Sequence, residues 1–337
     1  MALLATRYMG IKLRNPLVVG ASSLTSHLDS IRQIEDNGAG GLVVASLFEE
    51  QVQLERFKFE EELQRQEGLH AEMTTLFPKL EHAGPEEHLM WVRKAKESVG
   101  IPVIGSLNAI NAGTWGKWAV KLAQTGVDGL ELNFYAVPAS FDSPGTDIER
   151  EQIEILEKVR SSVSIPVSVK LSPFYTNPLH FLRNLDQAGV AGLVLFNRLF
   201  YPDIEALEQQ HITPVNYSTQ NDSRLALRFA GLLFGELQAD ICASTGIMAA
   251  TDVVKMILAG ATCVQTVSCL YKRGVSVITE ILDGLARWME AHAYGDLTDF
   301  RGKLSRRNSP EPWIYTRAQY AKLLLHPAEV AGSLRGS

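Results

Sequence analysis

The chain has 337 residues, of which 46% are apolar and 21% are charged, and its formal net charge is −6. This composition is typical of a folded globular protein and excludes a disordered chain, a collagen-like repeat and a small disulfide-stabilised domain. The excess of acidic over basic residues argues against nucleic acid or an anionic membrane as the main partner.

The chain starts with Met1–Tyr8, an apolar stretch too short for a secretory signal. No run approaches the roughly 18 apolar residues that span a bilayer, so we expect a cytoplasmic protein. The three cysteines, Cys242, Cys263 and Cys269, show no CxxC spacing. They predict a reducing compartment, without structural disulfides or a zinc site.

Two short patterns recur along the chain. In the first, Gly and one or more small residues precede a short apolar run, at 38–44, 126–132, 189–195 and 260–266. In the second, a Ser-Val segment leads into Ile-Pro and an apolar run, at 98–104 and 162–169. Both patterns predict a helix that ends at Gly or shortly before Pro, followed by a strand buried on both faces.

The repeats predict eight buried strands separated by amphipathic segments of helical length, such as 153–160 and 253–258. Eight such units favour an α/β fold of the closed (β/α)8 TIM barrel type, with an open doubly wound sheet as the alternative. The strands are expected at Leu17–Ala21, Leu42–Ser46, Val103–Leu107, Gly129–Asn133, Val167–Leu171, Gly192–Asn197, Asp240–Ser244 and Thr262–Thr266.

We expect one barrel domain over residues 1–310 and a C-terminal tail over 311–337. Tyr8–Leu13 would form half of an N-terminal β-hairpin that closes the barrel floor. Two connections are unusually long: 49–87, which is rich in Glu and expected to be helical, and 199–222, which is polar. Long loops in a compact domain are often lids or binding loops, so we expect both over the C-terminal face.

Polar residues stand at the ends of the predicted strands, where barrel enzymes bind their ligands. Lys170 lies within the apolar run 165–171. Its ammonium group cannot easily reach bulk water there and needs an anionic or carbonyl partner. One interpretation is a cation that stabilises charge on a cofactor or substrate; the alternative is a buried salt bridge with Glu131.

Amides and helix starts mark other strand ends. Asn108, Asn133 and Asn197 each offer a donor and an acceptor, which suits the imide or amide edge of a ligand, although loop capping is the alternative. Thr245-Gly246 and Val267-Ser268 are each expected to open the helix after the seventh or eighth strand. Adjacent helix N-termini form a ready phosphate site, so we expect phosphate there.

With these strand ends in this order, the sequence resembles the dihydroorotate dehydrogenase family over essentially its whole length. It is most similar to a bacterial branch usually called dihydroorotate dehydrogenase-like proteins. The motifs that carry the resemblance are 15–23, Glu131-Leu132-Asn133, Val169-Lys170-Leu171, Phe196-Asn197, Thr245-Gly246-Ile247, 258–261 with Val264-Gln265, and 299–303.

The resemblance implies a barrel that holds FMN over the strand ends and moves a hydride between the flavin and a C–C bond next to a carbonyl, as in pyrimidine biosynthesis. Lys170 would lie near flavin N1, where reduction places negative charge. Asn133 and Asn197 would bind a pyrimidine-like substrate. The residues assigned to the cofactor are Ala21, Ser22, Ser23, Ser46, Asn108, Asn133, Lys170, Thr245, Gly246, Val267 and Ser268.

The sequence also departs from the family. Ala136 stands where active members have a Cys or Ser base, and alanine has no titratable group. Ala45 replaces a second flavin-contacting lysine, and Arg198 replaces a small residue. Residues 218–224 replace a Gly-rich segment. Tyr135 is a candidate catalytic residue, since tyrosine is a poor base but a passable acid at neutral pH.

Three functions therefore remain open. The first is oxidation of dihydroorotate, with another group such as Tyr135 or Ser140, or water, in place of the base. The second is turnover of a different small-molecule substrate, with Arg198 and Arg224 binding another anion. The third is an inactive flavin-binding barrel that serves as an electron-transfer or binding subunit. Family members often form homodimers. Because the chain lacks a cysteine set for an iron–sulfur cluster, such a centre would belong to a redox partner protein.

Overall fold

The computed structural model describes residues 2–48, 85–108, 112–134, 141–198, 201–212 and 217–317. Within them, eight parallel strands form a closed barrel, because β4 pairs with β6 as well as with β3. The predicted (β/α)8 TIM barrel is therefore confirmed over the open-sheet alternative. The barrel strands are β3 (Leu17–Val19), β4 (Gly41–Val43), β6 (Val103–Asn108), β7 (Gly129–Phe134), β8 (Val167–Leu171), β9 (Gly192–Leu195), β12 (Asp240–Ser244) and β13 (Cys263–Thr266). A short strand, β5 (Leu47–Phe48), extends the pairing beside β6.

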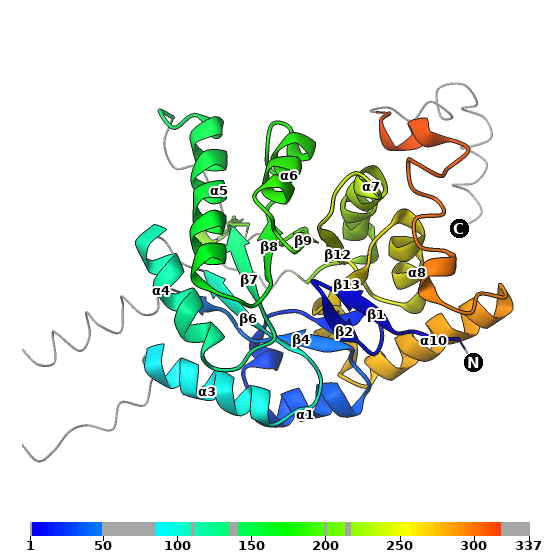
Figure 1. The fold of residues 1–337 in the computed structure, drawn as a ribbon, viewed down its shortest axis with the longest axis horizontal. Helices are drawn as coiled ribbons and strands as arrows, with labels where there is room; N and C mark the ends of the chain where they lie inside the picture. Colours follow the sequence, from blue (N-terminus) through cyan, green and yellow to red (C-terminus); the bar gives the residue numbers. More distant parts are fainter. Residues whose placement is uncertain are drawn as a thin grey trace, which may run out of the picture.

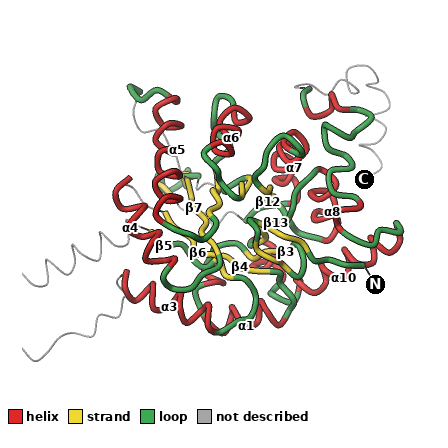
Figure 2. Tube along the Cα trace, in the orientation of Figure 1, coloured by secondary structure: helices red, strands yellow, loops and turns green. Residues whose placement is uncertain are grey.

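The helices surround the strands in chain order, which Figures 1 and 2 show as a ring around a central sheet. The breaks between them follow the predicted signals. For example, α8 ends at Ala259, Gly260 takes a φ of 133° that favours glycine, and β13 follows. The α-helices are α1 (Leu28–Asp36), α3 (Pro85–Glu97), α4 (Ala112–Ala123), α5 (Gly145–Ser162), α6 (Pro178–Gln187), α7 (Ser223–Leu233), α8 (Ala250–Ala259), α9 (Ser268–Arg273) and α10 (Val277–Ala291); four short 3₁₀ turns are η1 (Ser23–Thr25), η2 (Gln220–Asp222), η3 (Leu297–Asp299) and η4 (Pro312–Tyr315).

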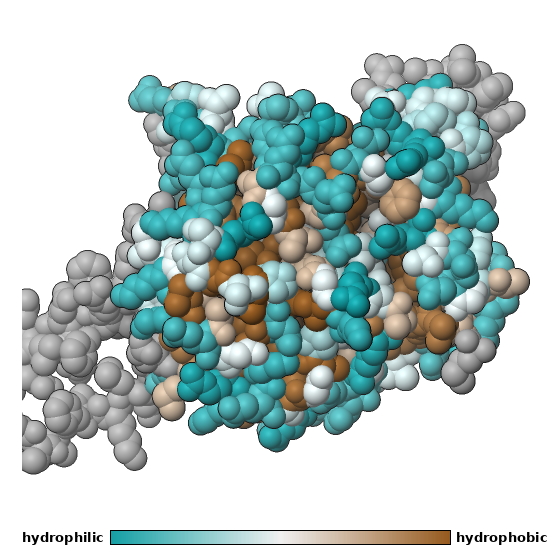
Figure 3. All heavy atoms as spheres, viewed as in Figure 1, coloured by the Kyte–Doolittle hydropathy of each residue, from teal (hydrophilic) through white to brown (hydrophobic). Residues whose placement is uncertain are grey.

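Side chains alternate between the two faces of each barrel strand. Outward residues such as Leu130, Leu132 and Val169 join the large apolar core between strands and helices. Inward residues are apolar near the floor, as Ile104 and Val194 are, and polar nearer the carboxyl ends. On the face seen in Figure 3, hydrophilic residues cover the helix ends and hydrophobic ones show between them toward the centre. The polar groups of the barrel interior are thus enclosed by an apolar wall.

An N-terminal hairpin closes the floor of the barrel, as predicted, but its turn lies inside the segment expected to be one strand. β1 (Thr6–Tyr8) pairs antiparallel with β2 (Ile11–Leu13). Met9 and Gly10 form the two-residue turn at φ values of 54° and 78°, as hairpin turns require. Tyr8 is 1% exposed, and the Met9 N–H donates to Asp240 Oδ2 at 2.8 Å.

Glycine is required where this hairpin meets β9. A Cβ at Gly192 would lie 2.7 Å from Tyr8 Oη and 2.9 Å from Met9 Cγ. The hairpin therefore seals the barrel by direct packing against the strand backbone.

The long connections are described in part. Of 49–87, residues 49–84 lie outside the described residues, and α3 begins at Pro85. The segment 199–222 contains an antiparallel hairpin of β10 (Asp203–Glu205) and β11 (Gln210–Ile212). In the predicted tail, η4 lies against α7, where Arg228 Nε donates to the carbonyl of Tyr315 at 2.8 Å.

Candidate functional site

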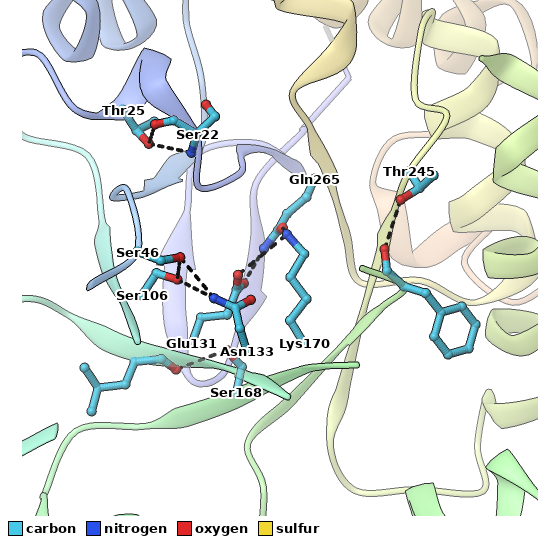
Figure 4. A network of polar contacts seen from close by, with 12 residues as sticks. Ser22, Thr25, Ser46, Ser106, Glu131, Asn133, Ser168, Lys170, Thr245 and Gln265 are labelled. Carbon is cyan, nitrogen blue, oxygen red and sulfur yellow. Dashed lines mark hydrogen bonds and ion pairs between the residues drawn. The ribbon is translucent and has the colours of Figure 1, made fainter. Parts of the chain in front are cut away.

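Polar side chains from four strands meet inside the barrel near its carboxyl end (Figure 4). Lys170 is 8% exposed and Glu131 is fully buried. Lys170 Nζ donates to Gln265 Oε1 at 3.1 Å, and Gln265 Nε2 donates to Glu131 Oε2 at 2.5 Å. Lys170 Nζ also lies 3.8 Å from Glu131 Oε1. The three residues form a closed triangle, so the buried salt bridge considered for Lys170 is present, and it lies at the expected ligand end of the barrel.

A second cluster lies beside the first. Asn133 Nδ2 donates to Ser106 Oγ at 2.8 Å and to Ser46 Oγ at 3.1 Å, and the two hydroxyls are 2.7 Å apart. Asn133 is 3% exposed. Because both amide hydrogens face serine oxygens, the side-chain carbonyl of Asn133 is left to accept from a ligand. Asn108, at the end of β6, is half-buried at the same rim.

The end of β9 lines a cleft of about 360 Å³. Asn197 and Arg198 contribute to it, together with Thr245 and Asp222. The Nδ2 atom of Asn197 is buried without a partner among the described residues, so it has hydrogens to donate to a ligand. Arg198 Nη1 lies 3.2 Å from Asp222 Oδ2. Burial opposes the ionisation of Asp222, but hydrogen bonds from Thr219 and the nearby guanidinium group of Arg198 lower the pKa of this carboxyl group.

The two loops expected to hold phosphate lie together and are bridged by Ser218. Gly246 N donates to Ser218 Oγ at 3.3 Å, and Ser218 N donates to Ser268 Oγ at 3.0 Å. Lys272 Nζ donates to the carbonyl of Ser218 at 2.9 Å. α9 begins at Ser268 with Val267 at its N-cap position, so Val267-Ser268 opens this helix as predicted.

The expectation that Thr245-Gly246 opens a helix is wrong. Both residues have positive φ values, 77° and 78°, which a right-handed helix cannot adopt, and α8 begins only at Ala250. The two residues instead form a turn after β12, held by a bond from Thr245 Oγ1 to the carbonyl of Phe196 at 2.9 Å.

The first strand end completes the rim. Ser22 N donates to Thr25 Oγ1 at 3.1 Å, while Ser22 Oγ is buried without a partner among the described residues. Ser23 Oγ lies 2.5 Å from the hydroxyl of Tyr271 on α9. Ala21 packs at the edge of the interior cluster. This strand end therefore adjoins α9, the helix that begins at Ser268.

Tyr135, the other predicted catalytic residue besides Lys170, is not among the described residues. Tyr135 belongs to 135–140, which lies outside the described residues, as does Ala136.

Ser106, Gln265 and Ser218 belong to the site although they were not among the predicted ligand residues. Ser106 and Gln265 are polar residues at inward positions of otherwise apolar strands, and that alternation was a readable signal. Ser218 comes from a long polar loop, and no local pattern places it between two strand ends.

The described part of the chain contains no helix with the length and apolar character needed to cross a membrane. A (β/α)8 barrel with a cation, amides and hydroxyls gathered at the strand carboxyl ends has the arrangement of a barrel enzyme that acts on a small molecule.

Comparisons with known proteins specify that class. A family model described as dihydroorotate dehydrogenase matches residues 82–289. The chain is 25% identical over 309 residues to the protein named dihydroorotate dehydrogenase B (NAD(+)), catalytic subunit, of Thermoplasma volcanium, covering 90% of this chain and 99% of the relative. Proteins of the same name from Thermoplasma acidophilum and Pyrococcus abyssi are each 26% identical, over 90% and 89% of this chain and 99% and 98% of their own lengths. The chain belongs to the dihydroorotate dehydrogenase family, as the sequence motifs indicated, and is an oxidoreductase of that type.

Proposed function

We propose that this protein is an FMN-dependent oxidoreductase that acts on a CH–CH bond next to a carbonyl. The observation that carries the proposal is Lys170, a nearly buried ammonium group at the ligand end of the barrel. FMN, when bound, would supply hydride transfer, and a fixed cation favours the negative charge that reduction adds.

The residues present fit the cofactor. Two buried polar atoms at the rim have no hydrogen-bond partner among the described residues: Ser22 Oγ and Asn197 Nδ2. Around them stand the hydroxyls and amides that suit the carbonyls and nitrogens of a flavin ring. Ser218, Gly246 and Ser268 bring hydroxyl and N–H groups together at the proposed phosphate end, with Lys272 adjacent. The residues that would hold FMN are those assigned from the sequence: Ala21, Ser22, Ser23, Ser46, Asn108, Asn133, Lys170, Thr245, Gly246, Val267 and Ser268.

Each side chain has a distinct task in this proposal. Asn133 offers its carbonyl and Asn197 its free Nδ2 hydrogens, so a substrate that carries both an N–H and a carbonyl is oriented between them. Arg198 binds an anionic group of the substrate in the cleft at the end of β9. The apolar barrel wall excludes water from below. Tyr135 donates or accepts the proton that accompanies hydride transfer.

Ala136 decides between two substrates. Dihydroorotate oxidation requires removal of a proton from carbon, and alanine cannot remove it. The observation favours a related compound, reduced or oxidised at a conjugated bond, over dihydroorotate itself. A flavin-binding barrel without its own catalysis, working as an electron-transfer subunit, is the alternative. The relatives' names, which include the words catalytic subunit, support a partner protein, and a homodimer is also part of the proposal.

The cellular setting in the proposal is the cytoplasm. The three cysteines are buried and free, which supports a compartment where thiols stay reduced.

Anaerobic titration of the purified protein tests these proposals. We expect a yellow protein whose flavin absorbance bleaches on reduction. A colourless preparation that ignores added FMN would contradict both enzyme functions. Dihydroorotate should bleach the flavin poorly in the native protein.

Substitutions at position 136 distinguish two explanations for slow turnover of dihydroorotate: the absence of a catalytic base, or a pocket that fits a different substrate. A136S and A136C restore a proton-accepting group, and A136V is the matched control without one. If the base alone limits the reaction, the bleaching rate with dihydroorotate rises by about 10²-fold or more in A136C and not in A136V. Equal rates in all variants would show that the pocket takes a different substrate.

A further inference from the structure

The triangle of Lys170, Gln265 and Glu131 places a carboxylate as well as a neutral acceptor beside the lysine. Gln265 Oε1 accepts from one of the three N–H donors of the ammonium group at 3.1 Å. Glu131 adds a full negative charge in the barrel interior, with no exposure to solvent. Its Oε1 atom makes no hydrogen bond to the described residues and lies 3.8 Å from Lys170 Nζ.

A buried ion pair of this kind is a poor means of stabilising a fold. Removing two charges from water costs about as much as their attraction returns, and apolar residues of similar volume often serve stability as well or better. A pair placed at the ligand end of the barrel therefore calls for a functional reason. Its effect on any ligand above it is electrostatic, because the carboxylate cancels part of the lysine's charge.

The other titratable groups that face Glu131 carry no positive charge that could balance its carboxylate. Tyr8 from β1 and Cys263 from β13 have pKa values raised by burial, so both are neutral at ordinary pH. Among the described residues, Lys170 is the cation that pairs with Glu131. The amide of Gln265 bridges the two by donating to one and accepting from the other, which fixes their separation.

We propose that Glu131 is a positioning residue. It holds the ammonium group of Lys170 through Gln265, and its negative charge offsets part of the positive field that this ammonium group exerts on the cofactor. This inference rests on the proposed function in taking FMN as the group above Lys170. Glu131 lowers the reduction potential of the flavin below the value that an unopposed lysine would give.

The variant E131Q tests this by removing the charge while keeping the shape. Its side-chain oxygen can still accept from Gln265 Nε2, so the bridge survives. The flavin of E131Q, equilibrated anaerobically with a reference dye, is expected to have a higher potential than the flavin of the native protein. The ratio of reduced to oxidised flavin should rise at least about tenfold, since loss of a neighbouring charge shifts an ionic equilibrium by about one unit or more. For a two-electron couple, tenfold corresponds to about 30 mV.

The flavin potential distinguishes this role from a structural one, because a merely structural role of Glu131 would leave the potential of a folded variant unchanged. The matched control is S168A on the same strand, where Ser168 Oγ donates to the carbonyl of Leu130 and does not contact the triangle. Its potential should equal that of the native protein.

A second readout does not need flavin. In the apoprotein at pH 8.5, acetic anhydride should acetylate Lys170 severalfold faster in E131Q than in the native protein or S168A, as measured by peptide mass spectrometry. If E131Q does not fold, Q265M removes the bridge and keeps the charge, and a smaller increase in acetylation is expected. Unchanged acetylation in a folded variant, or an unchanged potential, would overturn the inference. Failure of the native protein to bind FMN would refute the proposed function instead, and the acetylation result would still decide the role of Glu131.

Discussion

Removing the charge of Lys170 should cost more stability than removing both charges of its ion pair. In K170M, Glu131 keeps its charge in the barrel interior, with no exposure and no cation within ion-pair distance among the described residues. At 3.8 Å and an effective dielectric constant of about 20, the attraction between the two charges is about 4 kcal/mol. Loss of one partner of a buried pair costs about 3–5 kcal/mol, and the distance agrees with that range.

The double variant K170M/E131Q should recover most of that loss. It leaves two neutral side chains of similar volume, and Gln265 can still donate to the amide oxygen at position 131. We therefore expect the double variant to be within about 1–2 kcal/mol of the native protein, as replaced buried pairs often are. The measurement is equilibrium urea unfolding of the flavin-free protein at pH 7 for the native chain, both single variants and the double variant.

The coupling energy decides the outcome. If the losses of the two single variants add up in the double variant, the charges do not interact as the geometry implies, and the reasoning fails. A loss below about 1 kcal/mol in K170M would refute it as well, because it would place the carboxylate in a medium close to water.

Three further outcomes follow from other parts of the structure. Burial lowers the pKa of His88 to about 4, against about 6.5 when unfolded, so the folded state favours neutral imidazole and its stability falls as the pH drops from about 6.5 toward 4. The loss between pH 7 and pH 5 should be about 2 kcal/mol greater in the native protein than in H88Q by urea unfolding, and equal losses would contradict the burial of this ring. G192A should lower the free energy of unfolding by about 1–3 kcal/mol, because its Cβ would lie 2.7 Å from Tyr8 Oη. The control G113A, whose Cβ would meet nothing within 4 Å, should cause no loss of stability. Thermal unfolding of the two variants checks this prediction. G246A requires a positive φ and brings a Cβ within 2.7 Å of the carbonyl of Thr219, so FMN should bind at least about tenfold more weakly by fluorescence titration. An unchanged affinity would show that this turn does not contribute to FMN binding.

Much of the fold could be predicted because its signals are local. Glycine and proline end the helices, and short apolar runs covered on both faces follow, so eight units could be counted from the sequence. The hairpin turn was missed because Met9 is not a residue that usually adopts a positive φ. Thr245-Gly246 was placed at a helix start for a related reason: small residues after a strand suit either a cap or a left-handed turn.

The site was predictable where a residue's environment follows from its own strand. Lys170 and Asn133 are polar residues within apolar runs, and each lies where that pattern placed it. The partners are harder to predict, because closure of the barrel brings them together. Gln265 contacts Glu131 across 134 residues of sequence, and Ser218 reaches Gly246 only through the path of a long loop. Local patterns carry no information about such contacts.

The floor hairpin has a consequence for how the protein is made. Met9 bonds to Asp240, 231 residues later, and Leu17 pairs with Val264 on β13. At a synthesis rate of 5–20 residues per second, the hairpin and first strand leave the ribosome roughly 10–50 s before their partners exist. During that interval, Tyr8, Met9 and one edge of β3 lack the surfaces that cover them in the finished barrel. The floor hairpin is therefore synthesised before the strands that cover it, and it completes its native contacts only after β12 and β13 have been made.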